Sequence, residues 1–220
     1  LDATYLPVLD KLMVGLSTKE RGKVLRQFRT IVGSIIILAS PLSTVALAQI
    51  LAVAQGTVDS QMSMLHSVLS IPQSAESPVR LLHLSFRDFL LDSEKQEENP
   101  FWVDERATHE KLTTNCLKLL SENHRLREDI CGLEMPGRLR DDVDRQNIDS
   151  CLPSEVQYAC LYWVYHLKGS RVRLHDGHQA LQFLQHHFLH WLEALSLIGR
   201  ISESIGLIDQ LQNLVDVSQF

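Results

Sequence analysis

The stretch VRLLHLSFRDFL, residues 79–90, organises the first half of the chain. It is a short apolar run with a single histidine, His83, and it passes directly into a helical pattern. In an extended run Val79, Leu81 and His83 lie on one face. A histidine between leucines is either a core residue bonded to backbone or a donor directed at an anion in a cleft. Spacing alone favours the core position for His83.

Working back towards the start of the chain, apolar spacing predicts four helices. They cover residues 5–16, 17–39, 45–53 and 59–69, and the second begins with Ser17 and Glu20 at the spacing of a capping box. Ser43 and Thr44 cap the third. Three compact helices followed by an extended apolar run are in the order of a winged-helix domain. The predicted fold class is therefore mainly α, with a winged-helix-like domain that contains a short β element.

The predicted winged helix lacks the cations of a DNA reader. Between Thr30 and Val79 there is no lysine or arginine, and the segment 59–69 offers Gln61, His66 and serines instead. Phosphate contacts and base edges call for cations and amides on the recognition helix. With a net charge of −6, the chain has no overall field that attracts nucleic acid. We therefore expect no nucleic-acid partner.

After residues 79–90 the pattern changes to helices suited to stacking. The polar, proline-ended segment 94–100 is the best internal boundary, which predicts a region 1–95 (the end of a helical linker plus the winged-helix domain) and a helical domain 101–220. Helices are predicted at residues 105–120, 154–168, 178–198 and 201–217, with a long polar loop around one short helical turn at 123–151. The last three predict an antiparallel helical array.

Composition narrows the class of protein further. The four cysteines, Cys116, Cys131, Cys151 and Cys160, are 15, 20 and 9 positions apart and form no C-x-x-C pair, so reduced thiols in a cytoplasmic protein are expected. The apolar run at residues 35–39 is too short to span a membrane. Because the chain begins at Leu1, we expect a piece of a longer polypeptide.

Sites for catalysis or metal binding are not predicted. His186 and His190 share a helix face at ligand spacing, but the glutamate of H-E-x-x-H is absent and no nearby carboxylate or thiol completes a set. The sequence also has no G-x-S-x-G, Walker A or G-x-G-x-x-G motif. Histidines that flank an apolar stripe are the better explanation, and the chain is not expected to be an enzyme.

Residues 82–90, LHLSFRDFL, resemble the H-x-S-F-x-[DE]-F-[LF] signature in the winged-helix domain of NACHT-type STAND NTPases, which are NLR-like signalling proteins. The fungal branch, which includes vegetative-incompatibility proteins, is similar over further segments: YLPVL at 5–9, PLS at 41–43, CLP at 151–153, VQYAC at 156–160 and YW at 162–163. The chain resembles the winged-helix and helical region that follows the NTPase core of these proteins. The resemblance covers most of the chain.

The resemblance implies a regulatory, non-catalytic role. In that family the winged-helix histidine contacts the β-phosphate of ADP, a role that falls on His83 here. The P-loop, the Mg-binding acidic residues and the adenine pocket are absent from this sequence, so ADP or ATP with Mg belongs to the implied full-length protein. The implied partners are an upstream NACHT module, a downstream repeat domain and further copies on activation. The alternatives are a free-standing helical scaffold that binds a protein through the face of Tyr158 to Tyr165, and, less favoured, a DNA-binding winged helix.

Overall fold

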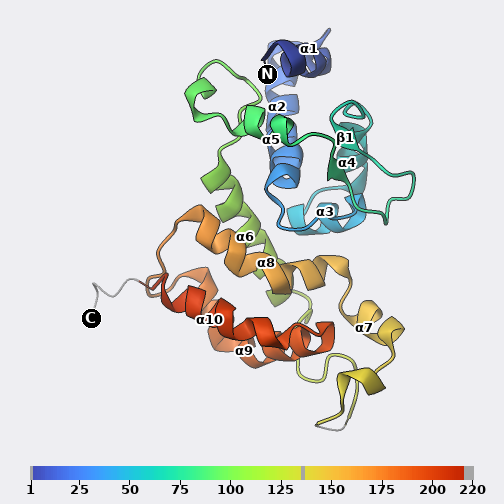
Figure 1. Cartoon of the computed structure of the whole chain (residues 1–220), viewed down its shortest axis with the longest axis vertical. Coiled ribbons are helices and arrows are strands. Elements are labelled where there is room, and N and C mark those ends of the chain that lie inside the picture. The colour runs from blue at the N-terminus through green and yellow to red at the C-terminus, as the bar shows by residue number, and fades with distance from the viewer. Residues whose placement is uncertain (1, 135–136, 216–220) are drawn as a thin grey trace. The chain divides into compact units, whose positions relative to one another are not determined.

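The computed structural model describes residues 2–134 and 137–215, and the chain divides into two compact units, residues 1–109 and 110–220. The described residues are mainly helical, with one small two-stranded sheet (Figure 1). The prediction of a mainly α fold is thereby confirmed. The winged-helix identity and the domain division at residues 95–101 stay predictions.

The first unit consists of short helices around a two-residue strand pair. Its elements are α1 (Asp2–Asp10), a 3-10 turn (Lys11–Met13), α2 (Thr18–Ile37), α3 (Thr44–Leu51), α4 (Gln55–Met62), β1 (Leu69–Ser70), β2 (Arg80–Leu81), α5 (Leu84–Leu91), a 3-10 turn (Ser93–Lys95) and the start of α6 (Glu105–Ser121). The strands pair antiparallel, Leu69 opposite Leu81 and Ser70 opposite Arg80. The core is rich in phenylalanine: Phe28, Phe86, Phe89 and Phe101 are all buried.

Capping residues explain where these helices begin. Both halves of the predicted capping box are present at α2, since the Ser17 hydroxyl accepts from the Glu20 amide and the Glu20 side chain accepts from the Ser17 amide. Ser43 caps α3 in the predicted way, accepting from the Ala46 amide at 3.1 Å. Sequence signals that depend on a few neighbouring residues are therefore reliable here.

Helix α4 corrects the predicted helix at 59–69. The helix spans Gln55–Met62, and the following residues form turns in which the amides of Leu65 and Val68 donate to the carbonyls of Met62 and Leu65. The apolar residues of this segment keep helical spacing, but their burial is achieved by turns and by strand β1. Gln61 is buried rather than offered at a surface, so it is not placed to read a base edge.

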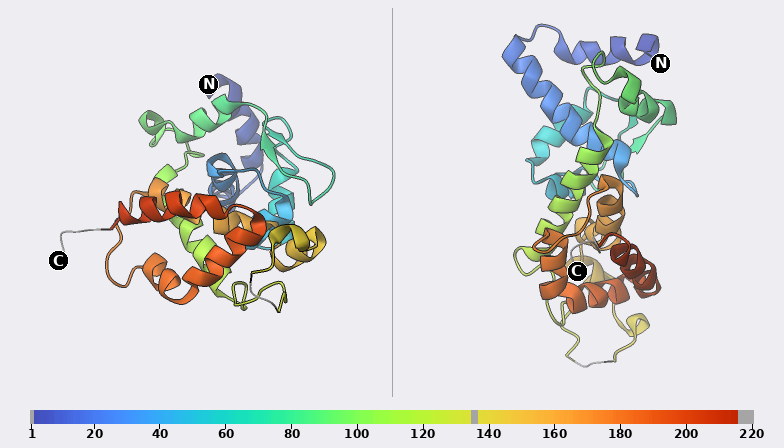
Figure 2. Two further views of the ribbon diagram at one scale, coloured as in Figure 1. Left: turned by 60° about the horizontal axis from the view of Figure 1, so that its bottom comes forward. Right: turned by 90° about the vertical axis from the view of Figure 1, so that its left-hand side faces the viewer.

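The second unit is a group of longer helices. It holds the rest of α6, a 3-10 turn (Arg140–Asp142), α7 (Arg145–Cys151), α8 (Ser154–Ser170), α9 (Gln179–Ile198), a 3-10 turn (Ile201–Glu203) and α10 (Ser204–Gln212). Figure 2 gives two further views of these helices. Trp163 of α8 lies edge-on to Trp191 and Phe183 of α9, at centroid distances of 5.5 and 5.6 Å. This aromatic cluster holds α8 and α9 together.

Three predictions for the second unit need correction. The loop at 123–151 contains a 3-10 turn and the helix α7 rather than one short turn. The predicted helix 201–217 begins with a 3-10 turn and its α-helical part ends at Gln212, while residues 216 and 217 lie outside the described residues. Tyr158, which the alternative scaffold hypothesis places on a docking face, is buried and its hydroxyl lies 2.8 Å from His166 Nε2. By contrast, α9 ends at Ile198, as predicted, and the structure has Gly199 at its C-cap with φ 81°.

Candidate functional site

His83 lies on the surface at the start of helix α5. It is the N-cap residue, in extended conformation with φ −139° and ψ 131°, and its side chain does not cap the helix. The strand before it is only two residues long, so the alternation that favoured a core position ends before His83 is reached. Val79 is buried, Leu81 is half-buried and His83 is exposed. The core alternative for His83 is therefore wrong.

The other residues of the signature hold α5 in place. Phe86, Phe89 and Leu90 are buried. The ring of Tyr5 packs against the rings of Phe86 and Phe89, with distances between ring centroids of 5.1 and 5.4 Å. The Tyr5 hydroxyl lies 2.8 Å from the Ser85 hydroxyl. Full burial of a phenylalanine stabilises a fold by about 1.5–3 kcal/mol. The packed aromatic residues therefore anchor helix α5, at whose start His83 lies.

Arg87 connects α5 to two other elements of the first unit. Its Nε donates to the carbonyl of Ile36 near the end of α2 at 3.0 Å, and its Nη2 lies 3.0 Å from Glu105 Oε1 in the first turn of α6. The bond to the Ile36 carbonyl satisfies an oxygen that has no partner within its helix. The ion pair is exposed and adds little by itself. Arg87 thus fixes the orientation of the helix that begins after His83.

The surface around His83 combines a polar donor with apolar side chains. Leu82 and Leu84, its chain neighbours, are 46% and 76% exposed. The first amides of α5 point towards the same end of the helix as His83, where the helix dipole is positive. An imidazole beside a helix N-terminus can bind an anion, and the exposed leucines can pack against a protein surface. Chemically, this end of α5 suits an anionic ligand that another protein module presents.

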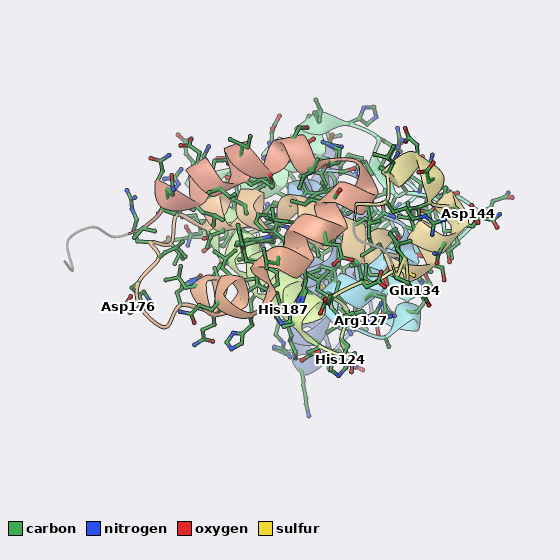
Figure 3. The ribbon with its side chains drawn as sticks, turned by 90° about the horizontal axis from the view of Figure 1, so that it is seen from below. His124, Arg127, Glu134, Asp144, Asp176 and His187 are labelled. Atoms are coloured by element: carbon green, nitrogen blue, oxygen red, sulfur yellow. The ribbon has the colours of Figure 1, made fainter. Side chains whose placement is uncertain are left out.

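The histidines of α9 do not form a comparable site. His186 Nδ1 lies 2.7 Å from the Gln182 carbonyl, and His187, labelled in Figure 3, stacks on Phe183. Burial lowers the pKa of His187, and the neighbouring His190 and His186 lower it further. Among the described residues, no group of three or more histidine, cysteine or acidic side chains is arranged to hold a metal ion.

A cavity of about 450 Å³ in the second unit has four acidic residues in its lining, Glu128, Asp129, Glu134 and Glu193, together with Arg138. Two of its carboxylates are already occupied by backbone amides. Glu193 accepts from the amides of Asp129 and Ile130, and Asp129 accepts from those of Leu133 and Glu134. The bonds from Glu134 and Leu133 lower the pKa of Asp129. The carboxylates of Glu193 and Asp129 therefore hold the backbone of the loop at residues 129–134. The excess of acidic residues in the lining makes the cavity unsuited to phosphate.

Sequence reasoning missed the supports of the site. Tyr5 lies 80 residues from Ser85, and no local pattern signals that contact. Arg87 falls on the half-buried side of α5 and looks like an ordinary surface cation in the sequence. Their roles appear only once the helices are packed. In the parts of the chain that the structure describes, no helix is long and apolar enough to cross a membrane.

Comparison with known proteins gives one informative match. The chain is 32% identical over 158 residues to the vegetative incompatibility protein HET-E-1 of Podospora anserina, an alignment that covers 64% of this chain and 11% of that protein. The chain thus spans about a tenth of the length of the relative. No family model matches the sequence, and no solved structure matches it.

Proposed function

We propose that this chain is a non-catalytic regulatory segment of an NLR-like STAND signalling protein of the fungal vegetative-incompatibility type. In this proposal it couples the ADP or ATP state of a separate, upstream NACHT module to a conformational change. The similarity to HET-E-1 supports the protein class. The observation that carries the proposal is the exposed position of His83 at the start of an anchored helix, within a signature typical of that class.

His83 acts in this proposal as a sensor of the bound nucleotide. With ADP in the NACHT module, the imidazole donates a hydrogen bond to the β-phosphate and ties the winged-helix region to that module. One charge-assisted bond of this kind contributes about 1.5–3 kcal/mol, which changes a two-state equilibrium by about ten- to hundred-fold. Loss of the bond releases the module and permits self-association. The exposed Leu82 and Leu84 belong to the same contact.

The remaining parts of the proposal concern the context of the chain. ADP or ATP with Mg is bound by the NACHT module rather than by this segment. The helices of the second unit pass the change on to a downstream repeat domain. The protein acts in the cytoplasm, without nucleic acid. These statements follow from the resemblance and are proposed together with it.

The test replaces His83 by leucine in a protein that joins this chain to its NACHT module. His83→Leu is expected to lower the retention of ADP by at least ten-fold and to increase assembly, measured by the nucleotide released on denaturation and by light scattering. His66→Leu is the matched control, because His66 is also an exposed histidine of the first unit but lies outside the signature. Equal ADP retention in both variants contradicts the proposed role.

A further inference from the structure

The second unit contains two pairs of neighbouring cysteines in different surroundings. Cys116 of α6 and Cys160 of α8 are fully buried, burial raises the pKa of Cys116 to about 12, and Cys116 adds to the raised pKa of Cys160. Cys131, in the loop after α6, is 7% exposed, and Cys151 at the end of α7 lies near enough to raise the pKa of the Cys131 thiol. Cys151 is partly exposed. Of the two pairs, only Cys131 and Cys151 include a thiol that solvent can reach, namely that of Cys151.

Both sides of the Cys131–Cys151 contact are held in position. Asn147 bridges them, since its Nδ2 donates to the Cys131 carbonyl at 3.1 Å and its Oδ1 accepts from the Cys151 thiol at 3.4 Å. Next to Cys131, the amide of Ile130 donates to Glu193 of α9. Asn147 and Glu193 therefore hold the two segments that carry the cysteines in position beside each other.

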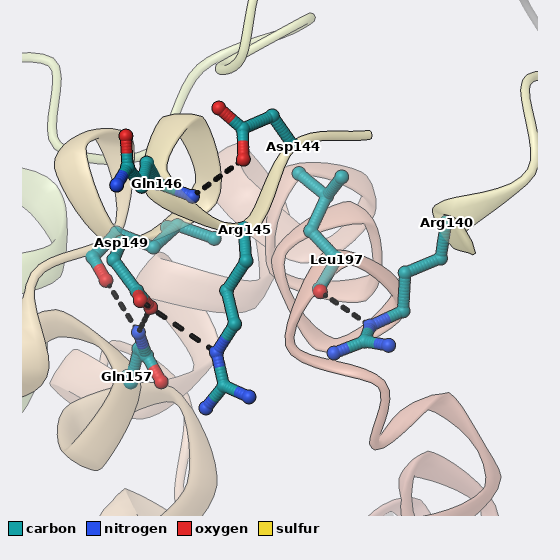
Figure 4. A network of polar contacts seen from close by, with 8 residues as sticks. Arg140, Asp144, Arg145, Gln146, Asp149, Gln157 and Leu197 are labelled. Atoms are coloured by element: carbon teal, nitrogen blue, oxygen red, sulfur yellow. Dashed lines mark hydrogen bonds and ion pairs between the residues drawn. The ribbon is translucent and has the colours of Figure 1, made fainter. Parts of the chain in front are cut away.

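Helix α7, which carries Cys151, is fixed by polar contacts shown in Figure 4. Asp144 caps its start, accepting from the Gln146 amide at 3.2 Å, and Gln157 of α8 donates to Asp149 Oδ1 at 3.1 Å and to the Leu152 carbonyl at 2.7 Å. Disulfides need sulfur atoms brought close on suitably placed backbones. The two cysteines lie on anchored segments that a single side chain, Asn147, joins at 3.1 and 3.4 Å, and this arrangement approaches that requirement.

We propose that Cys131 and Cys151 form a reversible disulfide when the chain meets hydrogen peroxide, which makes the loop after α6 and helix α7 a redox-sensitive link. Cys151, the accessible thiol, attacks the peroxide, so that an S–O bond forms, the O–O bond breaks and water leaves. Cys131 then loses its proton and attacks the Cys151 sulfur, which forms the S–S bond and releases a second water. Two thiols and one peroxide thus give one disulfide and two waters.

The order of the two steps follows from exposure. Burial raises the pKa of Cys131 to about 12, and the facing Cys151, Glu193 and Asp129 raise it as well. The second step therefore waits for deprotonation of Cys131, and the sulfenic acid on Cys151 accumulates first. The Cys116–Cys160 pair is an internal control, because it is closed to peroxide.

The experiment treats the folded 220-residue chain with hydrogen peroxide, blocks free thiols with N-ethylmaleimide and maps the non-reduced protein by mass spectrometry. Cleavage after Lys, Arg and Glu separates Cys151 in residues 146–155 from Cys160 in 156–168. A linked Cys131–Cys151 peptide that disappears with dithiothreitol is expected. Cys151 oxidised to sulfinic acid without a link, or a link through Cys116 or Cys160, overturns the proposal.

Three variants separate the steps. Cys131→Ser is expected to leave a sulfenic acid on Cys151, detected as a dimedone adduct, whereas Cys151→Ser prevents both adduct and link. Asn147→Ala keeps both thiols and is expected to slow linking about ten-fold; an unchanged rate contradicts its positioning role. In the native sequence, closing the loop is expected to raise Tm by roughly 5–10 °C, whereas Cys151→Ser shows no rise.

Discussion

Two groups of histidines, His83 in the first unit and His186, His187 and His190 in the second, occupy different positions on their helices. His83 begins a helix and is exposed. The other three lie within α9, where His186 contacts the preceding turn and His187 stacks on Phe183. A side chain within a helix finds partners on its own element, whereas one at a helix start faces away from it. For a candidate binding site, the position of a histidine on its helix therefore matters more than the number of histidines.

The largest expected effect separates the core part of the signature from its surface part. Phe86→Ala is expected to lower the free energy of unfolding by about 3–5 kcal/mol, because it empties a fully buried aromatic position. His83→Ala is expected to stay within about 0.5 kcal/mol of the native value, as for an exposed side chain. Urea denaturation followed by circular dichroism measures both. A large loss of unfolding free energy in His83→Ala would contradict the distinction between the core residues and the surface residues of the signature.

A smaller effect compares the two indoles in the core of the second unit. Trp191 Nε1 donates to the Cys160 carbonyl at 2.9 Å, while Trp163 Nε1 is buried and has no hydrogen-bond partner among the described residues. Trp191→Phe is therefore expected to cost about 1 kcal/mol more than Trp163→Phe in urea denaturation. If the two variants lose the same stability, the Trp191 bond contributes nothing measurable.

The smallest effect concerns the pH dependence of the α9 histidines. Because burial and two neighbouring histidines lower the pKa of His187 in the fold, the unfolded chain binds its proton more readily. Stability is then lost as the pH falls below about 6.5, the pKa of the unfolded residue. His187→Gln is expected to flatten this loss, measured as Tm against pH. A pH dependence of Tm that is unchanged in His187→Gln contradicts this assignment.

The parts of the fold that could be predicted are those determined by a few adjacent residues. Ser17 with Glu20 and Ser43 mark helix starts by accepting hydrogen bonds from backbone amides, and both do so in the structure. The helix expected at 59–69 failed for a different reason. Burial of Leu65 and Leu69 is compatible with helix, turn or strand, and only the surrounding packing selects among them.

The sequence identified the residue of the candidate site, but it did not predict whether that residue is buried or exposed. The signature pointed to His83, whereas its exposure depends on how short strand β2 is, and that in turn depends on the pairing with β1. The proximity of Cys131 and Cys151 had no signal in the sequence. The residues lie 20 positions apart and form no C-x-x-C pair, so their proximity results from the path of the loop between α6 and α7.

The contact of Tyr5 with the signature has a consequence for the order of folding. The Tyr5 and Ser85 hydroxyls join segments 80 residues apart, and the Tyr5 ring covers Phe86 and Phe89. During synthesis, helix α1 leaves the ribosome long before its aromatic partners exist. Contacts of such long sequence separation form late, since the entropy of closing the loop opposes them until other helices bring the ends together. The contacts of Tyr5 with helix α5 are therefore among the last contacts of the first unit to form.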